Sequence, residues 1–152
     1  PGCVTSPGKP KRTMPNDDPY LVFVSHSSKD AWIAHQMVRL IEERGKGYGV
    51  TTFLDEKNIE GGDIFSDEIF DAVERCDELV VLLSAYSVER PWVLAEIGAA
   101  LGQRKRVVGI VDKIPFDDIP DLLQQRKAYE LNDFEEYLDE LESRVQNLQT
   151  DE

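Results

Sequence analysis

The chain has only two cysteines, Cys3 and Cys76, among its 152 residues. Two cysteines do not make the framework of a disulfide-stabilised domain, and no His, Cys or carboxylate cluster has the spacing of a metal site. No apolar run approaches the ~18 residues of a membrane span, and no signal-peptide pattern is present, so we expect a cytoplasmic protein that does not contact a membrane. Cys76 lies in a helical pattern and is expected to be a small buried residue.

Positive charge is scarce as well. The chain carries 17 basic and 30 acidic residues, for a net charge of −13 at pH 7. The segment from Asp112 to the end alone holds 13 acidic and 4 basic residues. Binding to nucleic-acid phosphates needs clusters of Lys and Arg, so we expect no direct nucleic-acid partner. The acidic excess predicts a solvated surface, and the apolar fraction of 41% is enough for the core of one domain.

The apolar residues follow two alternating patterns. Short continuous apolar runs, typical of strands buried on both faces of a parallel sheet, occur at 20–24, 50–54, 79–83, 106–111 and 127–131. Between and after them, apolar residues recur at helical spacing. This alternation predicts an α/β fold, a flavodoxin-like five-stranded parallel sheet of order 2-1-3-4-5 with helices on both faces. Residues 1–18, with four prolines and two glycines, are expected to be a tail or linker, and 19–149 the folded domain.

Local signals mark the helix ends. Ser27 with Asp30 resembles a capping box, Gly45 is expected to end the first helix, and Asp63 can cap the second. Residues 119–125 are expected to form a short helical turn. The predicted inner faces are Ile33, Met37, Leu40 and Ile41 in the first helix, Phe65, Ile69, Ala72, Val73 and Cys76 in the second, and Phe134, Tyr137, Leu138, Leu141, Val145 and Leu148 in the last.

The segment 90–101 is predicted to start a helix just beyond the third strand. Pro91 suits the first helical turn, where a missing N–H costs nothing. Trp92 and Glu96 are four residues apart, so they lie one above the other on the same side of the helix. The face expected to pack on the sheet is Leu94, Ile97, Gly98 and Leu101.

In an open parallel sheet, ligands bind beyond the carboxyl ends of the strands, at the switch point between the first and third strands. This geometry places residues 25–28, 55–62 and 84–96 around one crevice. A receiver domain would need an acidic pair, an Asp and a Lys where this chain has Ser25-His26, Ser84 and Asn132. No Gly-rich phosphate loop or nucleophile elbow is present either. What remains is a carboxylate chemistry, because a Glu beside a ribose can stabilise or capture the oxocarbenium-like centre of a breaking N-glycosidic bond.

Three segments in order resemble the Toll/interleukin-1 receptor (TIR) domain family. Residues 22–30 (VFVSHSSKD) resemble its opening box in the prokaryotic form, residues 53–63 its long loop after the second strand, and residues 84–96 its third conserved region. The resemblance implies the flavodoxin-like fold. It also implies one of two functions, either TIR–TIR association in an adaptor or cleavage of NAD⁺ to nicotinamide and ADP-ribose or a cyclic variant.

The resemblance also assigns roles to single residues. In the enzymatic members the Glu four residues after the Trp is catalytic, which here is Glu96. Ser27 and Ser28 correspond to a loop that contacts the dinucleotide, Glu60 to the Glu ahead of the loop glycine, and Trp92 to the wall of the nicotinamide–ribose pocket.

His26 and Asp55 complete the set of substrate-binding candidates, because both adjoin the crevice. A hydrogen-bonded structural histidine and a loop-capping aspartate are the alternatives for these two. Ser27 can cap a helix and contact a ligand at once, since a helix N-terminus favours phosphate. Trp92 can equally be a packing aromatic, and Glu60 an exposed loop charge.

We therefore predict an NAD⁺ glycohydrolase that uses Glu96, with hydrolysis and cyclisation both open. NAD⁺ is its substrate, and no cofactor or metal is expected. The resemblance implies self-association through TIR–TIR contacts, other TIR proteins as partners, and a role in antiphage defence or signalling. The alternative is a non-catalytic TIR interaction module, which has no need of the Trp92-x-x-x-Glu96 pattern. A nucleoside deoxyribosyltransferase-like enzyme shares the fold and bond type but would need further acidic residues around the sugar.

Overall fold

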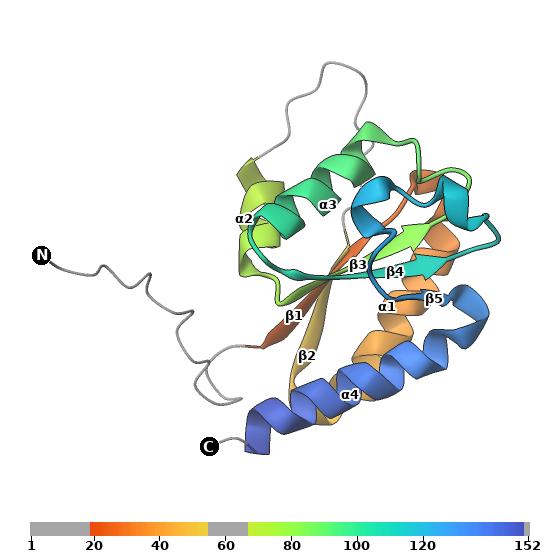
Figure 1. Cartoon of the computed structure of the whole chain (residues 1–152). Coiled ribbons are helices and arrows are strands. Elements are labelled where there is room, and N and C mark those ends of the chain that lie inside the picture. The colour runs from red at the N-terminus through yellow and green to blue at the C-terminus, as the bar shows by residue number, and fades with distance from the viewer. Residues whose placement is uncertain (1–18, 55–66, 151–152) are drawn as a thin grey trace, which may run out of the picture.

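The computed structural model describes residues 19–54 and 67–150. Five parallel strands form one sheet with the order β2-β1-β3-β4-β5, so the predicted flavodoxin-like topology is confirmed. The strands are β1 Tyr20–Ser25, β2 Val50–Leu54, β3 Glu78–Leu83, β4 Arg106–Val111 and β5 Ala128–Glu130. The helices are α1 Ala31–Gly45, α2 Asp67–Arg75, α3 Pro91–Gly102 and α4 Phe134–Thr150 (Figure 1).

The helices cover both faces of the sheet in pairs. Helices α1 and α4 pack together on one face, and α2 and α3 pack together on the other (Figure 1). Side chains alternate along each strand, so neighbouring residues supply different cores. Val22 and Val24 of β1 join the core under α1 and α4, whereas Phe23 joins the core under α2 and α3. A strand with both faces buried has to be apolar throughout, which explains the continuous apolar runs.

Several predicted details were wrong. The fifth strand is shorter than the run 127–131, because the 3₁₀ turn Leu131–Asp133 follows it directly and leads into α4. The segment after β4 forms two 3₁₀ turns, Phe116–Asp118 and Asp121–Leu123, rather than one at 119–125. Leu148 is 49% exposed instead of buried, while the other five residues predicted for the inner face of the last helix are buried. The predicted cap Asp63 and the predicted core residue Phe65 lie outside the described residues.

Gly45 ends α1 as predicted, but for a packing reason. Its backbone is not left-handed, with φ −89°, and the chain continues into the 3₁₀ turn Lys46–Tyr48. A Cβ at Gly45 would lie 2.4 Å from the Cβ of Val50, so only glycine lets α1 approach the start of β2 this closely. The left-handed turn falls instead on Gly49, with φ +71°.

A buried charged network ties β1, β3 and α4 together. The Glu78 side chain is fully buried at the start of β3. Its carboxylate accepts hydrogen bonds from the Tyr20 hydroxyl at 2.6 Å and the Tyr137 hydroxyl at 2.7 Å. The Arg144 guanidinium donates to both carboxylate oxygens at 3.1 Å. These contacts satisfy a charge that would otherwise be costly to bury, and they anchor α4 to the amino end of the sheet.

The same network changes the ionisation of the two phenols. Burial raises the pKa of Tyr137 well above its ordinary value of 10.0, and the nearby Glu78 charge raises it further. Burial, followed by the Glu78 charge, also raises the pKa of Tyr20. Both hydroxyls therefore stay protonated and keep donating to Glu78.

Within the described part of the chain, no helix is long and apolar enough to cross a membrane.

Candidate active site at the carboxyl end of the sheet

The switch point of the sheet lies at β1, which pairs with β2 on one side and with β3 on the other. The segments that leave the carboxyl ends of β1 and β3 therefore adjoin each other, as predicted for the crevice. They supply the predicted candidates His26, Ser27 and Ser28. Asp55 and Glu60, predicted on the segment after β2, lie outside the described residues.

Ser27 caps a short helical turn after β1. Its buried side chain accepts a hydrogen bond from the Lys29 backbone N–H at 3.3 Å and starts the 3₁₀ turn Ser28–Asp30 that leads into α1. The predicted cap at Ser27 is confirmed, but the reciprocal half of the capping box is wrong, because the Asp30 carboxylate turns to a different partner. Ser28 is exposed to solvent.

Asp30 links the two segments of the switch point. Its carboxylate accepts a hydrogen bond of 2.5 Å from the Ser84 hydroxyl, the first residue after β3, and both side chains are buried. The Ser84 hydroxyl also accepts from the backbone N–H groups of Tyr86 and Ser87. Ser87 in turn accepts from the Ser84 N–H at 2.8 Å and donates to the Leu82 carbonyl at 2.6 Å. This buried network holds together the two segments that follow β1 and β3.

The Asp30–Ser84 pair was not predicted as part of the site. The sequence did contain a pattern that indicates such a pair, because polar residues follow β1 and β3, the two strands that adjoin at the switch point. The three-residue spacing of Ser84 and Ser87 also indicates a hydrogen-bonded turn. The pair was missed because Asp30 was predicted to form a capping box with Ser27 instead.

Two further polar residues lie at the end of β1. Ser25 is 1% exposed, and its hydroxyl has no hydrogen-bond partner among the described residues. His26 is also buried, at 8% exposure. At the rim, the Lys29 ammonium lies 5.0 Å from the centre of the half-exposed Tyr86 ring. A hydroxyl donor, an imidazole and a cation thus follow one another along this segment.

Helix α3 begins at Pro91, as predicted, after an extended Arg90. Its sheet-facing residues differ from the predicted face, because only Ile97 of Leu94, Ile97, Gly98 and Leu101 is buried. The buried residues of the helix are Val93, Glu96, Ile97 and Ala100. Apolar side chains surround most of this helix, so their pattern alone does not fix which side packs on the sheet.

Glu96 is the unexpected member of the buried face. It is 1% exposed, although it lies on the second turn of a helix that starts at the carboxyl end of the sheet. Trp92, one turn earlier, is half-buried and packs against the core under α2 and α3. Taking a carboxylate out of water costs several kcal/mol unless interactions compensate it. A glutamate in this position is therefore not the ordinary solvated charge of a helix surface.

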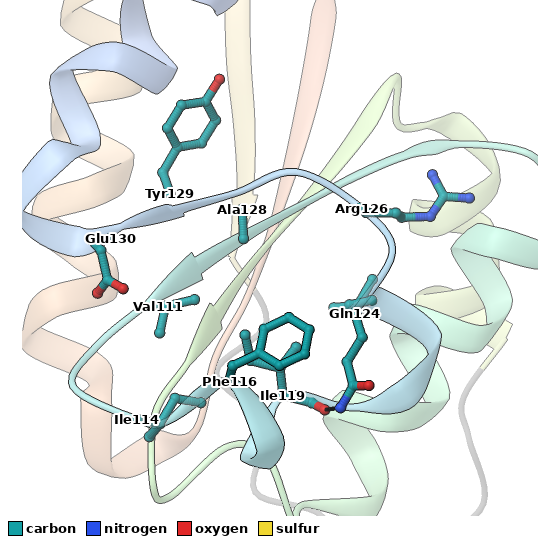
Figure 2. A pocket seen from close by; sticks show the side chains of 10 residues that line it. Val111, Ile114, Phe116, Ile119, Gln124, Arg126, Ala128, Tyr129 and Glu130 are labelled. Atoms are coloured by element: carbon teal, nitrogen blue, oxygen red, sulfur yellow. Dashed lines mark hydrogen bonds between the residues drawn. The ribbon is translucent and has the colours of Figure 1, made fainter.

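A second cleft lies along the same edge of the sheet, between the carboxyl ends of β4 and β5 and the two 3₁₀ turns after β4 (Figure 2). It has a volume of ≈ 270 Å³ and mostly apolar walls, including Phe116, which is 60% exposed. The Gln124 amide in its wall donates to the Ile119 carbonyl at 2.9 Å. None of the predicted site residues lines it.

The described residues contain no group of three or more His, Cys, Asp or Glu side chains placed to hold a metal ion. The polar groups gathered at the switch point are hydroxyls, an imidazole and carboxylates. Their chemistry is that of hydrogen bonding and charge stabilisation. The fold and this site together define the class of the protein, a flavodoxin-like α/β domain with a buried glutamate on the helix that leaves its switch point.

Comparison with known proteins identifies the family. The sequence profile described as TIR domain matches residues 22–144, which is most of the chain. The chain therefore belongs to the TIR domain family. This result confirms the TIR family that the three sequence segments indicated.

Individual relatives give further comparisons. The chain is 25% identical over 120 residues to a Brachypodium distachyon protein described as a probable 2′ cyclic ADP-D-ribose synthase, BdTIR. The match covers 78% of this chain and 53% of that protein, so the chain spans about half the length of this relative.

Solved structures share the fold at low sequence identity. The TIR domain of the Toll-related receptor TRR-2 from Hydra magnipapillata is 16% identical, with a TM-score of 0.61 over 85% of this chain and 98% of that one. A 2-desoxiribosyltransferase from Leishmania mexicana is 15% identical, with a TM-score of 0.57 over 80% of this chain and 98% of that one. Likenesses this remote concern the architecture alone.

Proposed function

We propose that this TIR domain cleaves the nicotinamide–ribose bond of NAD⁺ and that Glu96 is its catalytic carboxylate. The observation that carries the proposal is the burial of Glu96, at 1% exposure, on the helix that leaves the switch point. A carboxylate that is shielded from water stabilises a developing positive charge far better than a solvated carboxylate does. The relative described as a probable 2′ cyclic ADP-D-ribose synthase supports the same chemistry.

The reaction needs only one charged group from the protein. The bond between ribose C1′ and the nicotinamide nitrogen breaks, and its electron pair leaves with nicotinamide, which becomes neutral. The remaining oxocarbenium-like centre at C1′ is stabilised, or captured, by the Glu96 carboxylate. Attack by water then gives ADP-ribose and a proton, whereas attack by a hydroxyl of the same molecule gives a cyclic ADP-ribose.

The other candidates position the substrate in this proposal. Trp92 forms the wall beside nicotinamide and its ribose, one helical turn from Glu96. Ser28, exposed after β1, and Ser27 at the start of the 3₁₀ turn contact the dinucleotide. His26 borders the same crevice. Asp55 and Glu60 remain expectations for the segment after β2.

The decisive experiment compares NAD⁺ consumption by three proteins: wild type, Glu96→Gln and Glu136→Gln. Glu136 is an exposed residue of α4, on the opposite face of the sheet from α3, so it is a matched control for loss of one carboxylate (Figure 1). Proteins at high concentration with a crowding agent are incubated with NAD⁺, and the products are separated by chromatography. A deoxynucleoside with a free base is a second test substrate, because it tests the transferase alternative.

We expect wild type and Glu136→Gln to release nicotinamide at equal rates. Glu96→Gln should lose at least ~10²-fold, the scale of removing one transition-state charge contact. Thermal unfolding of each variant confirms that the loss is not a folding defect. Equal consumption by Glu96→Gln would show that Glu96 is not the catalyst. Consumption by none of the three proteins, at concentrations where light scattering shows assembly, would favour the non-catalytic module.

An interaction role has its own support in the exposed apolar side chains. Trp32 on α1 is 74% exposed, and Phe116 and Leu122 beside β4 are 60% and 56% exposed. Large aromatic residues in contact with water are typical of association surfaces. We propose that the domain associates with itself or with other TIR proteins and that assembly accompanies activity, in defence against phage or another signalling role. Activity that rises more steeply than linearly with protein concentration would support this part, and strictly linear activity of a monomer would refute it.

A further inference from the structure

A basic cleft opens at the edge of the sheet opposite the candidate active site. It has a volume of ≈ 220 Å³ and lies where β4 begins and the chain enters β5, beneath α4. Arg106 comes from the start of β4, Arg126 and Lys127 from the lead into β5, and Arg144 from α4. Strands β4 and β5 are parallel neighbours, so their amino ends bring these residues to the same edge.

The charge in this cleft is opposite to that of the whole molecule. Four cations and one carboxylate, Glu140, line it in a chain of net charge −13. Lys127 pairs with Glu140 at 3.0 Å, and Arg144 pairs with the buried Glu78 at 3.1 Å. Arg106 and Arg126 make no ion pair within the part of the chain that the structure describes. Two guanidinium groups at this point of the surface therefore have no ion-pair partner among the described residues.

The walls also contain buried polar groups. Tyr129 is 4% exposed and lies on the side of β5 opposite to Ala128 and Glu130 (Figure 2). The Glu140 carboxylate is close enough to add to the effect of burial in raising the pKa of Tyr129, so the hydroxyl stays protonated. The buried Arg144 Nε has no hydrogen-bond partner among the described residues. A buried donor of this kind is usually satisfied by an acceptor.

We propose that this cleft binds a phosphate group of a small molecule. Phosphate carries only acceptor oxygens and up to two negative charges, which match the Arg144 Nε donor and the two guanidinium groups that have no ion pair among the described residues. The planar fork of arginine fits phosphate in a bidentate way. The volume is below the roughly 300 Å³ of a typical ligand pocket, which fits one phosphate or diphosphate group rather than a peptide. Val108 and the Tyr129 ring supply an apolar wall for an attached sugar or base.

This site is separate from the proposed catalytic crevice. Its cations lie at the amino ends of β4 and β5 and on α4, whereas Ser27 and Ser84 follow β1 and β3 at the other edge. The proposal therefore does not depend on NAD⁺ cleavage. Variants in the basic cleft and variants of Glu96 are expected to act independently.

Binding of inorganic pyrophosphate and of ADP is measured by calorimetry at constant ionic strength. Chloride is the reference anion, because it carries charge but no phosphate group. The test variant is Arg106→Gln with Arg126→Gln, because both side chains are exposed and their loss leaves no carboxylate unpaired. The control is Arg39→Gln with Lys46→Gln, two exposed cations of the α1 region that do not line the cleft. Thermal unfolding with each ligand gives a second readout, because a ligand that binds only the folded state raises Tm.

We expect at least one of the two ligands to bind wild type and the control with affinities within twofold of each other. The test variant should bind at least tenfold more weakly, and added salt should weaken binding in wild type. Equal affinity for both ligands would mean that the phosphates alone are recognised, and tighter binding of ADP would mean that the apolar wall contributes. Absence of binding by both ligands, or binding that the test variant leaves unchanged, would overturn the proposal.

Discussion

Replacing Glu78 by Gln tests whether the buried charge network holds the domain together. The change keeps the size of the side chain but removes the charge that faces Arg144. In the wild type, Tyr20 and Tyr137 each donate to a different carboxylate oxygen of Glu78. The glutamine keeps only one oxygen that can accept from them. The free energy of unfolding should fall because the Arg144 guanidinium then remains beside the core without its counter-charge.

The magnitude follows from the contacts. Breaking a buried ion pair from one side costs about 3–5 kcal/mol. Because the Arg144 side chain is 21% exposed and partly solvated, the lower end, about 3 kcal/mol, is the expected loss. At 2–4 °C per kcal/mol for a chain of this size, Tm should fall by roughly 6–12 °C.

Urea unfolding measures the free energy, and thermal unfolding measures Tm. Glu136→Gln on the solvent face of α4 is the control and should change stability by less than about 0.5 kcal/mol. Glu78→Gln combined with Arg144→Met should lose clearly less than the sum of the two single variants, because removing both charges leaves neither one unpaired. A loss below about 1 kcal/mol in Glu78→Gln, or strict additivity in the double variant, would refute the account of a charge-dependent anchor.

Three further predictions concern pH, packing and the switch point. The phenols of Tyr20 and Tyr137 ionise near pH 10.0 in the unfolded chain but at higher pH in the folded one, so their contribution to stability is complete below pH 10 and falls as pH rises above it. Tyr137→Phe should reduce the loss of stability between pH 10 and 11 by about 1 kcal/mol in urea titrations, and an unchanged loss would contradict the assignment. Gly45→Ala should cost about 1–3 kcal/mol because its Cβ meets Val50, whereas Gly98→Ala, with nothing within 4 Å, should be neutral or stabilising; equal effects would refute the packing argument. Ser84→Ala should cost about 1–3 kcal/mol in urea unfolding because the buried Asp30 carboxylate loses its 2.5 Å donor, and a neutral effect would mean that this link does not support the site.

The sequence by itself determined the architecture. A continuous apolar run is fully buried only in a strand that is covered on both faces. Such runs, when they alternate with amphipathic segments, fold into a parallel sheet with helices on both sides. The strand β4 was predicted to the residue, and so was every position of α2 that the structure describes as buried. In α1, Met37 and Ile41 are buried as predicted, but Ile33 and Leu40 are only half-buried and the buried Ala34 was missed. Sequence also identified the segments that meet at the switch point, because strand order fixes which carboxyl ends adjoin.

Only the tertiary structure decided which polar groups meet. The partners of Glu78 lie 58, 59 and 66 positions away in the sequence, and Ser84 lies 54 positions from Asp30. No local pattern encodes such pairs, because each depends on how helices and strands pack. The rotation of α3, which buries Glu96 rather than exposing it, was likewise open in a helix with apolar residues on most sides. The basic cleft arises in the same way, since its cations come from three segments that only the folded sheet brings to one edge.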